Sequence, residues 1–473
     1  MKDLTEFVIC HLNDDTSRLI LDRGKYPRID MDLAVTCIES RRKLKGKIQE
    51  WYDEPGLIFP VRLSAEQCSS SATGKYKAEV AEKIMGSLDF ARNDRKKGSR
   101  ERDEWSIMDM TGGLGVDSWF FSKKASKVIY CEMQEPLCKA ARHNFQILKA
   151  ENITVNNILI TPESCRALLT EHNPDIVYID PAIRGEGGKK VFLIEDCTPD
   201  VLTVKDEIFR HVRHILIKLS PMADITMVCQ RLGSTCREVH VVAAGGECKE
   251  LLIWMDREWD DEAAIISVEI QSQTLSHHPF FRFTVSEEKA VQPTYDGRLT
   301  SLKSKEGCQK GGIDMPPPAR GRERLGKWSS GPLQRAATVG AGVNGTLWQP
   351  DYCLFEPGKA LMKAAPFNLI ASRFGICKLG KSTHYYTTDN LDKVEELKQY
   401  GKVFRIVECL PLDKRNIKEV GKIYPKAEVT ARNIPMDTDT LRKKLGVTSG
   451  DDAHIFGLKS DAEGNLLIIA ERI

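Results

Sequence analysis

The stretch that decides the fold runs from residue 105 to residue 117 and reads Trp105-Ser-Ile-Met-Asp-Met-Thr-Gly-Gly-Leu-Gly-Val-Asp117. Its first six residues have the composition of a buried strand, the glycines form a loop, and residues 116–124 have the pattern of a helix. The alternation continues with strands at 127–131 and 175–181 and a helix at 136–150. Short apolar strands that alternate with amphipathic helices predict a parallel sheet with helices on both faces. The predicted fold class is therefore α/β.

An acidic residue lies at or next to the end of each of these predicted strands. Asp109 ends the first strand, Glu132 ends the second, and Asp180 ends the third. In parallel α/β sheets, ligands bind beyond the carboxyl ends of the strands. The three carboxylates and the glycine loop therefore predict one ligand site at that edge of the sheet.

The glycine loop allows two interpretations. Gly113, Gly115 and Ser118 nearly match the dinucleotide-binding pattern, and Glu132 lies near the position of a ribose-binding acid. This alternative makes the protein an oxidoreductase with a nicotinamide or flavin cofactor. Asp109, which directly precedes the loop, favours S-adenosyl-L-methionine instead, because a carboxylate attracts the ammonium group of that cofactor and repels a pyrophosphate.

Two further features fit S-adenosyl-L-methionine. Glycines at positions 112, 113 and 115 let the backbone approach the amino-acid part of a ligand without an intervening side chain. Glu132 presents two acceptor oxygens that can hold ribose hydroxyls.

The predicted reaction site is Asp180-Pro181. Proline removes an N–H donor and stiffens the turn, which fixes the direction of the nearby carbonyl groups. Methyl transfer to nitrogen is an in-line displacement that depends mainly on positioning, with a carboxylate or carbonyl that accepts the N–H of the acceptor. Asp180 and Pro181 are therefore the predicted catalytic residues.

The overall composition excludes several classes of protein. The 473 residues carry a net charge of +2, with 41% hydrophobic and 29% charged residues, which indicates a soluble protein of two or three domains. The 14 cysteines contain no C-x-x-C pair and the histidines lack metal-ligand spacing, so we predict no disulfide framework and no metal. A charged N-terminus and the lack of a run of about 18 apolar residues predict a cytoplasmic protein.

Composition predicts five segments, which are a helical region at 1–100, an α/β core at 101–285, a disordered linker or insertion at 286–347, a segment at 348–400 and an α+β module at 401–473. The linker is predicted because a segment rich in Gly, Pro, Ser, Lys and Arg cannot bury enough apolar surface to fold. About seven strands are expected in the core, which ends in an antiparallel pair at 250–255 and 263–270.

Other stretches leave their role open. Ser64 and Gln67 have the spacing of a helix capping box, but small hydroxyl residues beside an apolar helix can equally line a ligand cleft. The basic run 41–47 is either a solvated helix face or a nucleic-acid contact. In the C-terminal module, basic residues gather on two predicted helices, 416–424 and 438–445, which predicts contact with an RNA backbone.

Several motifs together resemble a known family. In chain order they are Pro55-Gly-Leu-Ile-Phe-Pro60, Leu63-Ser-Ala-Glu-Gln-Cys-Ser-Ser70, Asp109-Met-Thr-Gly-Gly-Leu-Gly-Val-Asp117, Tyr178-Ile-Asp-Pro-Ala182, Val191-Phe-Leu-Ile-Glu-Asp-Cys197, Phe355-Glu-Pro357 and Thr430-Ala-Arg-Asn433. The chain resembles bacterial class I S-adenosylmethionine-dependent methyltransferases with a C-terminal THUMP-like module. Their catalytic domain is related to the trimethylguanosine synthase group. The resemblance covers nearly the whole chain except about residues 286–347.

This resemblance implies a Rossmann-like methyltransferase core, a ferredoxin-like segment at 348–400 and a THUMP-like domain at 401–473 that binds RNA. It implies that S-adenosyl-L-methionine is held by Asp109, Thr111, Gly112, Gly113, Gly115, Asp117 and Glu132. It also implies that Asp180 and Pro181 face the methyl acceptor. The expected function is methyl transfer from S-adenosyl-L-methionine to a base nitrogen of structured RNA.

The acceptor loop departs from the family pattern. Amino-methylating relatives usually carry an aromatic residue after Asp-Pro-Pro that stacks on the base, whereas Ala182 and Ile183 stand here. Trp51, Tyr52 and Tyr76 are candidates to supply the stacking surface from the N-terminal region. One alternative function is an RNA-binding protein with a non-catalytic cofactor pocket. The second is the nicotinamide-dependent oxidoreductase.

Overall fold

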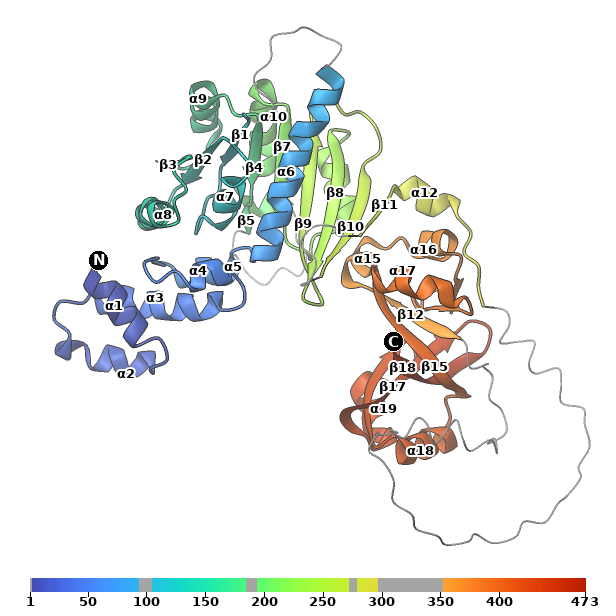
Figure 1. Ribbon diagram of the computed structural model, residues 1–473. Coiled ribbons are helices and arrows are strands. Elements are labelled where there is room, and N and C mark those ends of the chain that lie inside the picture. The colour runs from blue at the N-terminus through green and yellow to red at the C-terminus, as the bar shows by residue number, and fades with distance from the viewer. Residues whose placement is uncertain (1, 93–103, 184–193, 272–278, 297–351) are drawn as a thin grey trace, which may run out of the picture. The chain divides into compact units, whose positions relative to one another are not determined.

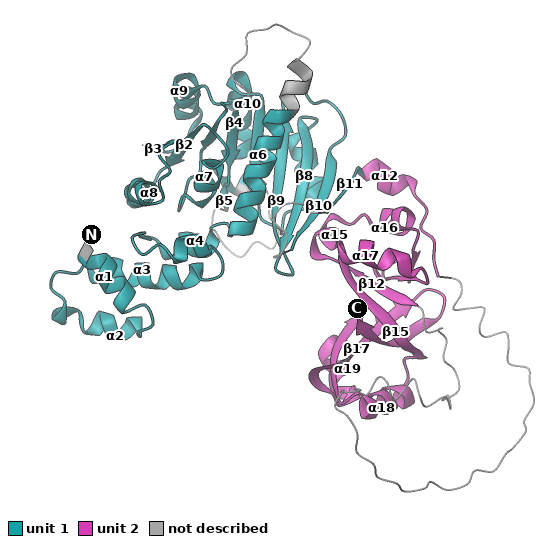
Figure 2. Cartoon of the chain, in the orientation of Figure 1, with its two compact units in different colours: residues 1–284 teal, residues 285–473 magenta. Residues whose placement is uncertain are grey.

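The structure, a computed structural model, describes residues 2–92, 104–183, 194–271, 279–296 and 352–473. The chain divides into two compact units, Met1–Thr284 and Val285–Ile473 (Figure 2). The finer boundaries predicted from composition stay predictions. Within the described ranges, no helix is both long and apolar enough to cross a membrane.

The first unit is built on a nine-stranded sheet with the order β11-β10-β8-β9-β7-β4-β1-β2-β3 (Figure 1). Its strands are β1 (Ser106–Asp109), β2 (Lys127–Glu132), β3 (Ile153–Asn157), β4 (Ile176–Ile179), β7 (His214–Leu219), β8 (Cys236–Ala244), β9 (Glu247–Asp256), β10 (Ala264–Ile270) and β11 (Phe280–Phe283). The strands from β3 to β7 are parallel, whereas β9 runs antiparallel between β7 and β8. The predicted parallel α/β sheet is confirmed.

The order of the strands reverses at β1, and this reversal places the site. β1 pairs with β2 on one side and with β4 on the other, so Asp109 lies opposite both Tyr130 and Tyr178. In open α/β sheets, ligands bind in the crevice outside the carboxyl ends of the strands at such a switch point. Because Asp109 is the last residue of β1, it lies at the base of that crevice.

Helices cover both faces of the sheet because parallel strands need crossover connections, and these are right-handed. The crossovers are α7 (Val116–Phe121), α8 (Glu135–Ile147), α9 (Pro162–His172) and α10 (Val201–His211). The long helix α6 (Ser71–Arg92) packs on α7, and α9 packs on α10. α11 (Ile225–Leu232) follows β7, and the short strands β5 (Ala182–Ile183) and β6 (Cys197–Thr198) pair with each other.

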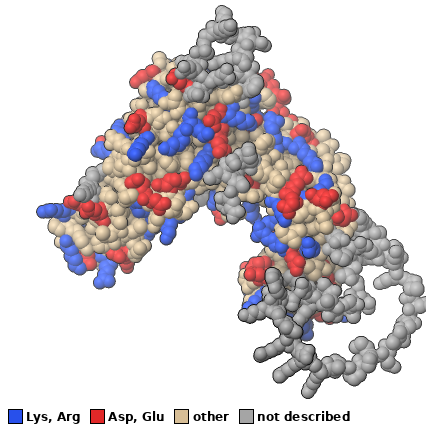
Figure 3. All heavy atoms as spheres, viewed as in Figure 1, with Lys and Arg blue, Asp and Glu red and all other residues tan. Residues whose placement is uncertain are grey.

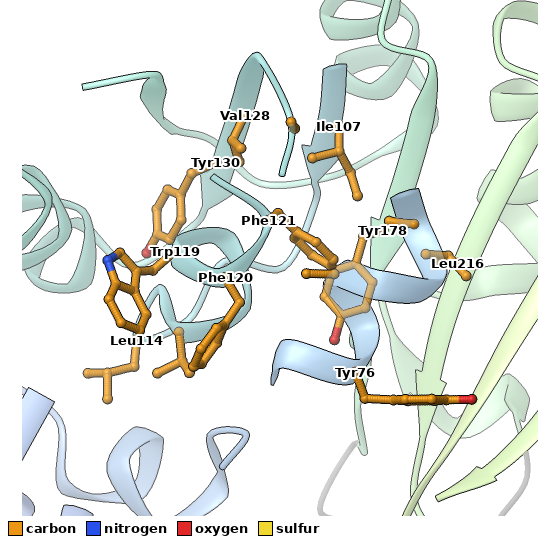
Figure 4. Packing of buried hydrophobic residues seen from close by; sticks show 14 of the residues in the cluster. Tyr76, Ile107, Leu114, Trp119, Phe120, Phe121, Val128, Tyr130, Tyr178 and Leu216 are labelled. Atoms are coloured by element: carbon orange, nitrogen blue, oxygen red, sulfur yellow. The ribbon is translucent and has the colours of Figure 1, made fainter. Parts of the chain in front are cut away.

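The core beside the crevice is rich in aromatic residues. Figure 4 shows Trp119, Phe120 and Phe121 of α7 in one cluster with Tyr130 and Tyr178 of the strands and Tyr76 of α6. Phe121 contacts Tyr178 edge to face, with 5.0 Å between the ring centroids. Phe120 packs so closely on α6 that a Cβ at Gly74 would overlap its ring. This aromatic layer fixes the helix that follows the glycine loop.

Five short helices precede α6, in agreement with the predicted helical character: α1 (Lys2–Cys10), α2 (Thr16–Leu21), α3 (Met31–Leu44), α4 (Gln49–Tyr52) and α5 (Arg62–Gln67). Two residues of the basic run 41–47 hold the connecting loops. Arg41, 2% exposed, donates hydrogen bonds to backbone carbonyls between residues 52 and 57. Lys47 donates to the carbonyls of Ala65 and Glu66. For these two residues, neither predicted role of the run is correct.

Three features of the sheet differ from the prediction. The sequence pattern does not predict β3 or α9, and β3 is a short edge strand in which no residue is fully buried. The strands near 250–255 and 263–270 do not pair with each other, since β9 inserts between β7 and β8 and β10 lies parallel to β8. The described residues form nine strands in this sheet instead of about seven. Strand neighbours depend on tertiary packing and cannot be read from local periodicity.

The second unit has a seven-stranded sheet with the order β13-β14-β12-β15-β18-β17-β16. Its strands are β12 (Cys353–Pro357), β13 (Cys377–Lys378), β14 (Tyr386–Thr388), β15 (Gly401–Pro411), β16 (Lys426–Arg432), β17 (Thr448–Ser460) and β18 (Gly464–Arg472). Its helices include α15 (Lys359–Ala364), α16 (Phe367–Phe374), α17 (Val394–Lys398), α18 (Lys414–Ile423) and α19 (Thr438–Leu445). The predicted α+β module is confirmed.

The segment predicted to be disordered from residue 286 begins with ordered residues. α12 (Val285–Ala290) presents Glu288, whose carboxylate accepts hydrogen bonds from the backbone N–H groups of Asn368 and Leu369 in the first turn of α16. Asp296 is buried and accepts a hydrogen bond from the Thr387 hydroxyl. The prediction for residues 286–296 is therefore wrong, because composition averaged over the segment hides two specific polar contacts. Residues 297–347 lie outside the described part of the chain.

Candidate functional site

A cavity of about 760 Å³ lies at the carboxyl ends of β1, β2, β4 and β7. Eight of the nine predicted site residues line it: Asp109, Thr111, Gly112, Gly113, Asp117, Glu132, Asp180 and Pro181. The ninth, Gly115, is the N-cap residue before α7 and has a φ of +91°, and a Cβ there would lie 2.7 Å from the Phe145 ring. Gly115 therefore shapes the loop from behind, where only glycine fits.

Asp109 is buried at the floor of the cavity and is held by neutral donors. Its Oδ1 accepts a hydrogen bond from the backbone N–H of Thr111 at 3.0 Å, and its Oδ2 accepts one from the Ser118 hydroxyl at 2.6 Å. Burial, together with the nearby carboxylates of Asp117 and Asp180, raises the pKa of Asp109 to about 7. At neutral pH this carboxyl is therefore only partly ionised, and a cation beside it would favour the charged form.

Glu132 is fixed by the backbone on both sides. Its Oε2 accepts from the Gly113 N–H at 3.0 Å and its Oε1 from the Gln134 N–H at 2.8 Å. The Tyr130 hydroxyl donates to the Gly113 carbonyl at 2.6 Å, and a Cβ at Gly112 would overlap the Tyr130 ring. The loop can take this conformation only because position 112 carries no side chain.

Asp117 belongs to a buried cluster of charges. Its Oδ2 accepts hydrogen bonds from the Tyr178 hydroxyl at 2.8 Å and the Ser69 hydroxyl at 3.0 Å, and its Oδ1 lies 3.4 Å from Nζ of Lys77. Lys77, which is fully buried, binds both oxygens of Glu250 at 2.8 and 2.9 Å. Despite its burial, the pKa of Asp117 is lowered because Lys77 and Lys218 stabilise the carboxylate.

Asp180 lies beside β7 rather than alone at the end of β4. Its backbone N–H donates to the Thr111 hydroxyl at 2.6 Å, and its Oδ2 forms an ion pair with Nζ of Lys218. Thr111 therefore links the loop after β1 to the turn after β4. Burial lowers the pKa of Lys218, but the carboxylates of Asp180, Asp117 and Glu250 outweigh that effect and raise it, so the ammonium is retained.

Residues of the segment 63–69 form another part of the cavity wall. The capping box predicted for Ser64 and Gln67 is wrong, because α5 begins after Val61 and has no side-chain cap. Both residues line the cavity instead, as does Ser69, which donates to Asp117. The cleft-lining alternative is therefore the correct one.

The predicted stacking residues do not reach this cavity. Trp51 is fully buried against Trp119, with 5.9 Å between the ring centroids, and the Tyr76 hydroxyl is bonded to His240 at 2.6 Å. Neither these two nor Tyr52 is among the described residues that line the cavity. The sequence suggested these residues as a surface on which a base could stack, but the rings of Trp51 and Tyr76 pack in the protein core instead.

Sequence reasoning missed Lys218 and Lys77, the cations of the site, and Glu250, the carboxylate that Lys77 binds. Lys218 stands in the otherwise apolar strand His214-Ile-Leu-Ile-Lys218, and Glu250 precedes the apolar run of β9. A single charge inside an apolar strand is a usable signal, because buried charges occur almost only with partners. Lys77 gives no such signal within its polar helix. Among the described residues, no cluster of three or more His, Cys, Asp or Glu side chains could hold a metal ion.

A mostly parallel sheet, with one antiparallel strand inserted and a cavity at the switch point, defines a Rossmann-like α/β fold. Comparison with family models matches residues 401–472 to a THUMP domain-like family and residues 353–394 to a ferredoxin-like domain. No curated protein matches the chain.

The chain is similar over nearly its whole length to a solved structure, a protein of Porphyromonas gingivalis W83 provisionally assigned as a methyltransferase. The two share 26% identity over 99% of this chain and 97% of the other, with a TM-score of 0.75. The resemblance to methyltransferases with a C-terminal THUMP-like domain, and the predicted fold class, are thereby confirmed.

Partial matches include an rRNA methylase of Streptococcus thermophilus, with 15% identity, coverage of 33% of this chain and 87% of the other, and a TM-score of 0.24. Another is a SAM-dependent methyltransferase of Agrobacterium tumefaciens, with 16% identity, coverage of 37% and 62%, and a TM-score of 0.25. At such low TM-scores these two matches carry no argument about this chain.

Proposed function

We propose that this protein is an S-adenosyl-L-methionine-dependent methyltransferase that acts on a base nitrogen of structured RNA. The observation that carries the proposal is the cavity of about 760 Å³ with Asp109, Glu132 and Asp180 on its wall. Its size is that of a small-molecule site. The full-length likeness to the Porphyromonas gingivalis structure supports methyl transfer as the reaction.

The residues around the glycine loop fit this cofactor. Backbone donors orient both oxygens of Glu132, whose remaining lone pairs can accept hydrogen bonds from the two ribose hydroxyls. Asp109 offers its carboxylate to an ammonium group. Met133 and Leu159, 56% and 53% exposed, give the cavity an apolar rim that suits the adenine ring. When bound, the cofactor supplies an electrophilic methyl group on a sulfonium.

The turn after β4 would position the acceptor. Asp180 keeps one carboxylate oxygen outside its ion pair with Lys218, and this oxygen can accept the N–H of the acceptor. Thr111 holds the backbone of Asp180, so the position of this turn depends on the cofactor loop. Such fixed placement is the main contribution that an enzyme makes to an in-line transfer.

The C-terminal module supports RNA as the substrate. On α18, Lys414, Lys418 and Lys422 are exposed at helical spacing, and Lys443 and Lys444 are exposed on α19. The two helices pack against each other, so these five cations can contact one phosphate backbone. Figure 3 shows both signs of charge intermingled on the visible face, so RNA affinity would depend on such local groups.

Calorimetric titration with S-adenosylhomocysteine and with NAD tests the cofactor assignment. We expect micromolar binding of S-adenosylhomocysteine, little binding of NAD, and at least tenfold weaker binding of S-adenosylhomocysteine to Asp109→Ala, because the ammonium loses its anion. Tight binding of NAD alone would favour the oxidoreductase.

Incubation with methyl-labelled cofactor and total RNA from cells lacking the gene tests the reaction. We expect an N-methylated base after digestion to nucleosides, and no labelled product with Asp180→Ala although that variant still binds S-adenosylhomocysteine. Cofactor binding without any label in RNA would support the non-catalytic alternative.

A further inference from the structure

Lys218 has a position that the proposed reaction does not yet explain. Ile217 of β7 lies opposite Ile179 of β4, so the next pair along the two parallel strands is Lys218 and Asp180. Nζ of Lys218 pairs with Oδ2 of Asp180, and both residues line the cavity. The Lys218 side chain is 14% exposed and that of Asp180 is 34% exposed, so the pair is reachable from the cavity.

The charges around this pair are nearly balanced. Behind it, Lys77 binds Glu250 and lies 3.4 Å from a carboxylate oxygen of Asp117. The three carboxylates of Asp117, Glu250 and Asp180 thus face two ammonium groups, of which Lys218 is the one that lines the cavity. Without Lys218, Asp180 would present an unpaired carboxylate at the place where the acceptor nitrogen must lie.

An unpaired carboxylate and a paired one select different acceptors. An unpaired carboxylate binds a protonated amine strongly, and a protonated amine has no electron pair with which to attack. A carboxylate beside an ammonium offers one acceptor and one donor side by side. This combination is complementary to the edge of a nucleobase, on which an uncharged N–H lies next to a hydrogen-bond acceptor.

On the basis of the proposed methyltransferase function, we propose that Lys218 is a specificity residue of the transfer site: it cancels the charge of Asp180 and, with it, binds an uncharged nitrogen on the donor–acceptor edge of a nucleobase. Oδ1 of Asp180 accepts the N–H, and Lys218 donates to the neighbouring acceptor atom. The nitrogen bonds to the methyl carbon as the carbon–sulfur bond breaks, and its proton passes to Oδ1 of Asp180 and then to water.

The test compares two ligands that differ only at the point of transfer. S-adenosylhomocysteine carries nothing there, whereas sinefungin carries a protonated amine in place of the methyl group. In calorimetry the wild type should bind the two ligands with affinities within about threefold of each other, because the ammonium of Lys218 cancels the charge of Asp180. Lys218→Met should raise the preference for sinefungin about tenfold, because the carboxylate is then free to pair with the amine.

Matched variants separate charge from structure. Lys218→Arg keeps the charge and should keep the wild-type ratio, and the double variant Lys218→Met/Asp180→Asn should restore it. Lys249→Met is the control, because Lys249 is a half-exposed lysine of β9 that pairs with Glu247 at 2.7 Å. If Lys218→Met does not fold, Asp180→Asn with Lys218 intact should make the preference for sinefungin fall below that of the wild type.

Two results would overturn the inference. In the first, Lys218→Met binds S-adenosylhomocysteine normally and its ligand ratio is unchanged. In the second, Lys218→Arg behaves like Lys218→Met. Failure of the wild type to bind either ligand would instead overturn the proposed function, so the two failures are distinguishable.

Discussion

At the ends of β1 and β2, the carboxylates of Asp109 and Glu132 are held by neutral groups, the Ser118 hydroxyl and backbone N–H groups. At the ends of β4 and β7, by contrast, Asp180 is paired with the ammonium of Lys218. Neutral donors orient a carboxylate without cancelling its charge, whereas a cation cancels it. We call the part of the site around Asp109 and Glu132 the anionic end, which suits a cationic ligand. The part around Asp180 and Lys218 is the neutralised end, which suits an uncharged ligand.

The largest expected effect is a loss of stability on removal of Lys77, the buried cation behind the neutralised end. Lys77→Met leaves Glu250 and Asp117 without their cation and should lower the free energy of unfolding by about 3–5 kcal/mol. Urea denaturation measures this change. Lys75→Met on the same helix is the control, because its surface pair with Glu50 contributes at most about 1 kcal/mol. Equal losses in the two variants would contradict the buried cluster.

At the anionic end, the glycine loop should tolerate no side chain. Gly112→Ala puts a methyl group into the Tyr130 ring, and the resulting shift of the loop should weaken S-adenosylhomocysteine binding by about 5- to 100-fold. Calorimetry measures the affinity. Gly86→Ala in α6, where a Cβ meets open space, should leave binding unchanged and raise stability slightly. Unchanged affinity in Gly112→Ala would separate the loop from the ligand site.

The charge of Asp109 should make ligand binding depend on pH. Its pKa in the free protein is about 7, above the ordinary 3.8, so raising the pH from about 4 to 7 costs stability because the unfolded chain ionises first. A bound ammonium favours the ionised form, so affinity should rise about tenfold between pH 6 and pH 8. Binding should release about 0.9 proton at pH 6 and about 0.1 at pH 8.

Calorimetry in two buffers of different ionisation enthalpy measures that proton release. Asp109→Asn is the control, and its binding should be weak and independent of pH in this window. A proton release that persists in Asp109→Asn would assign the titration to another group.

The smallest expected effect comes from removing a single hydrogen bond at the anionic end, the one that Ser118 donates to Asp109. The Ser118 hydroxyl favours the ionised form of Asp109, so Ser118→Ala should raise the pKa of that carboxyl further. The midpoint of the pH dependence should move up by about half to one pH unit. Ser122→Ala, at the end of the same helix, is the control, since the Ser122 hydroxyl donates to the Trp119 carbonyl and not to Asp109. A midpoint that does not move would show that Asp109 does not control binding.

Local sequence was informative about the anionic end because its residues lie within one strand–loop–helix unit. Asp109, Gly112 and Gly113 are separated by only a few residues, and Glu132 ends the next strand. Once the alternation of strands and helices is recognised, parallel packing brings these residues to the same edge. The same holds for the elements of the C-terminal module, whose periodicities are strong enough to predict each strand and helix.

Only the tertiary structure decided the neutralised end. Lys77 and Glu250 are 173 residues apart in the chain, and Lys218 and Asp180 are 38 apart. These contacts depend on which strands are neighbours and on how α6 packs, as does the insertion of β9 between β7 and β8. Hydrophobic periodicity states which face of an element is buried but not against what it is buried. The sequence by itself thus determined the strands that carry the site and the acidic residues at their ends, and tertiary packing decided which of those acids is paired with a cation.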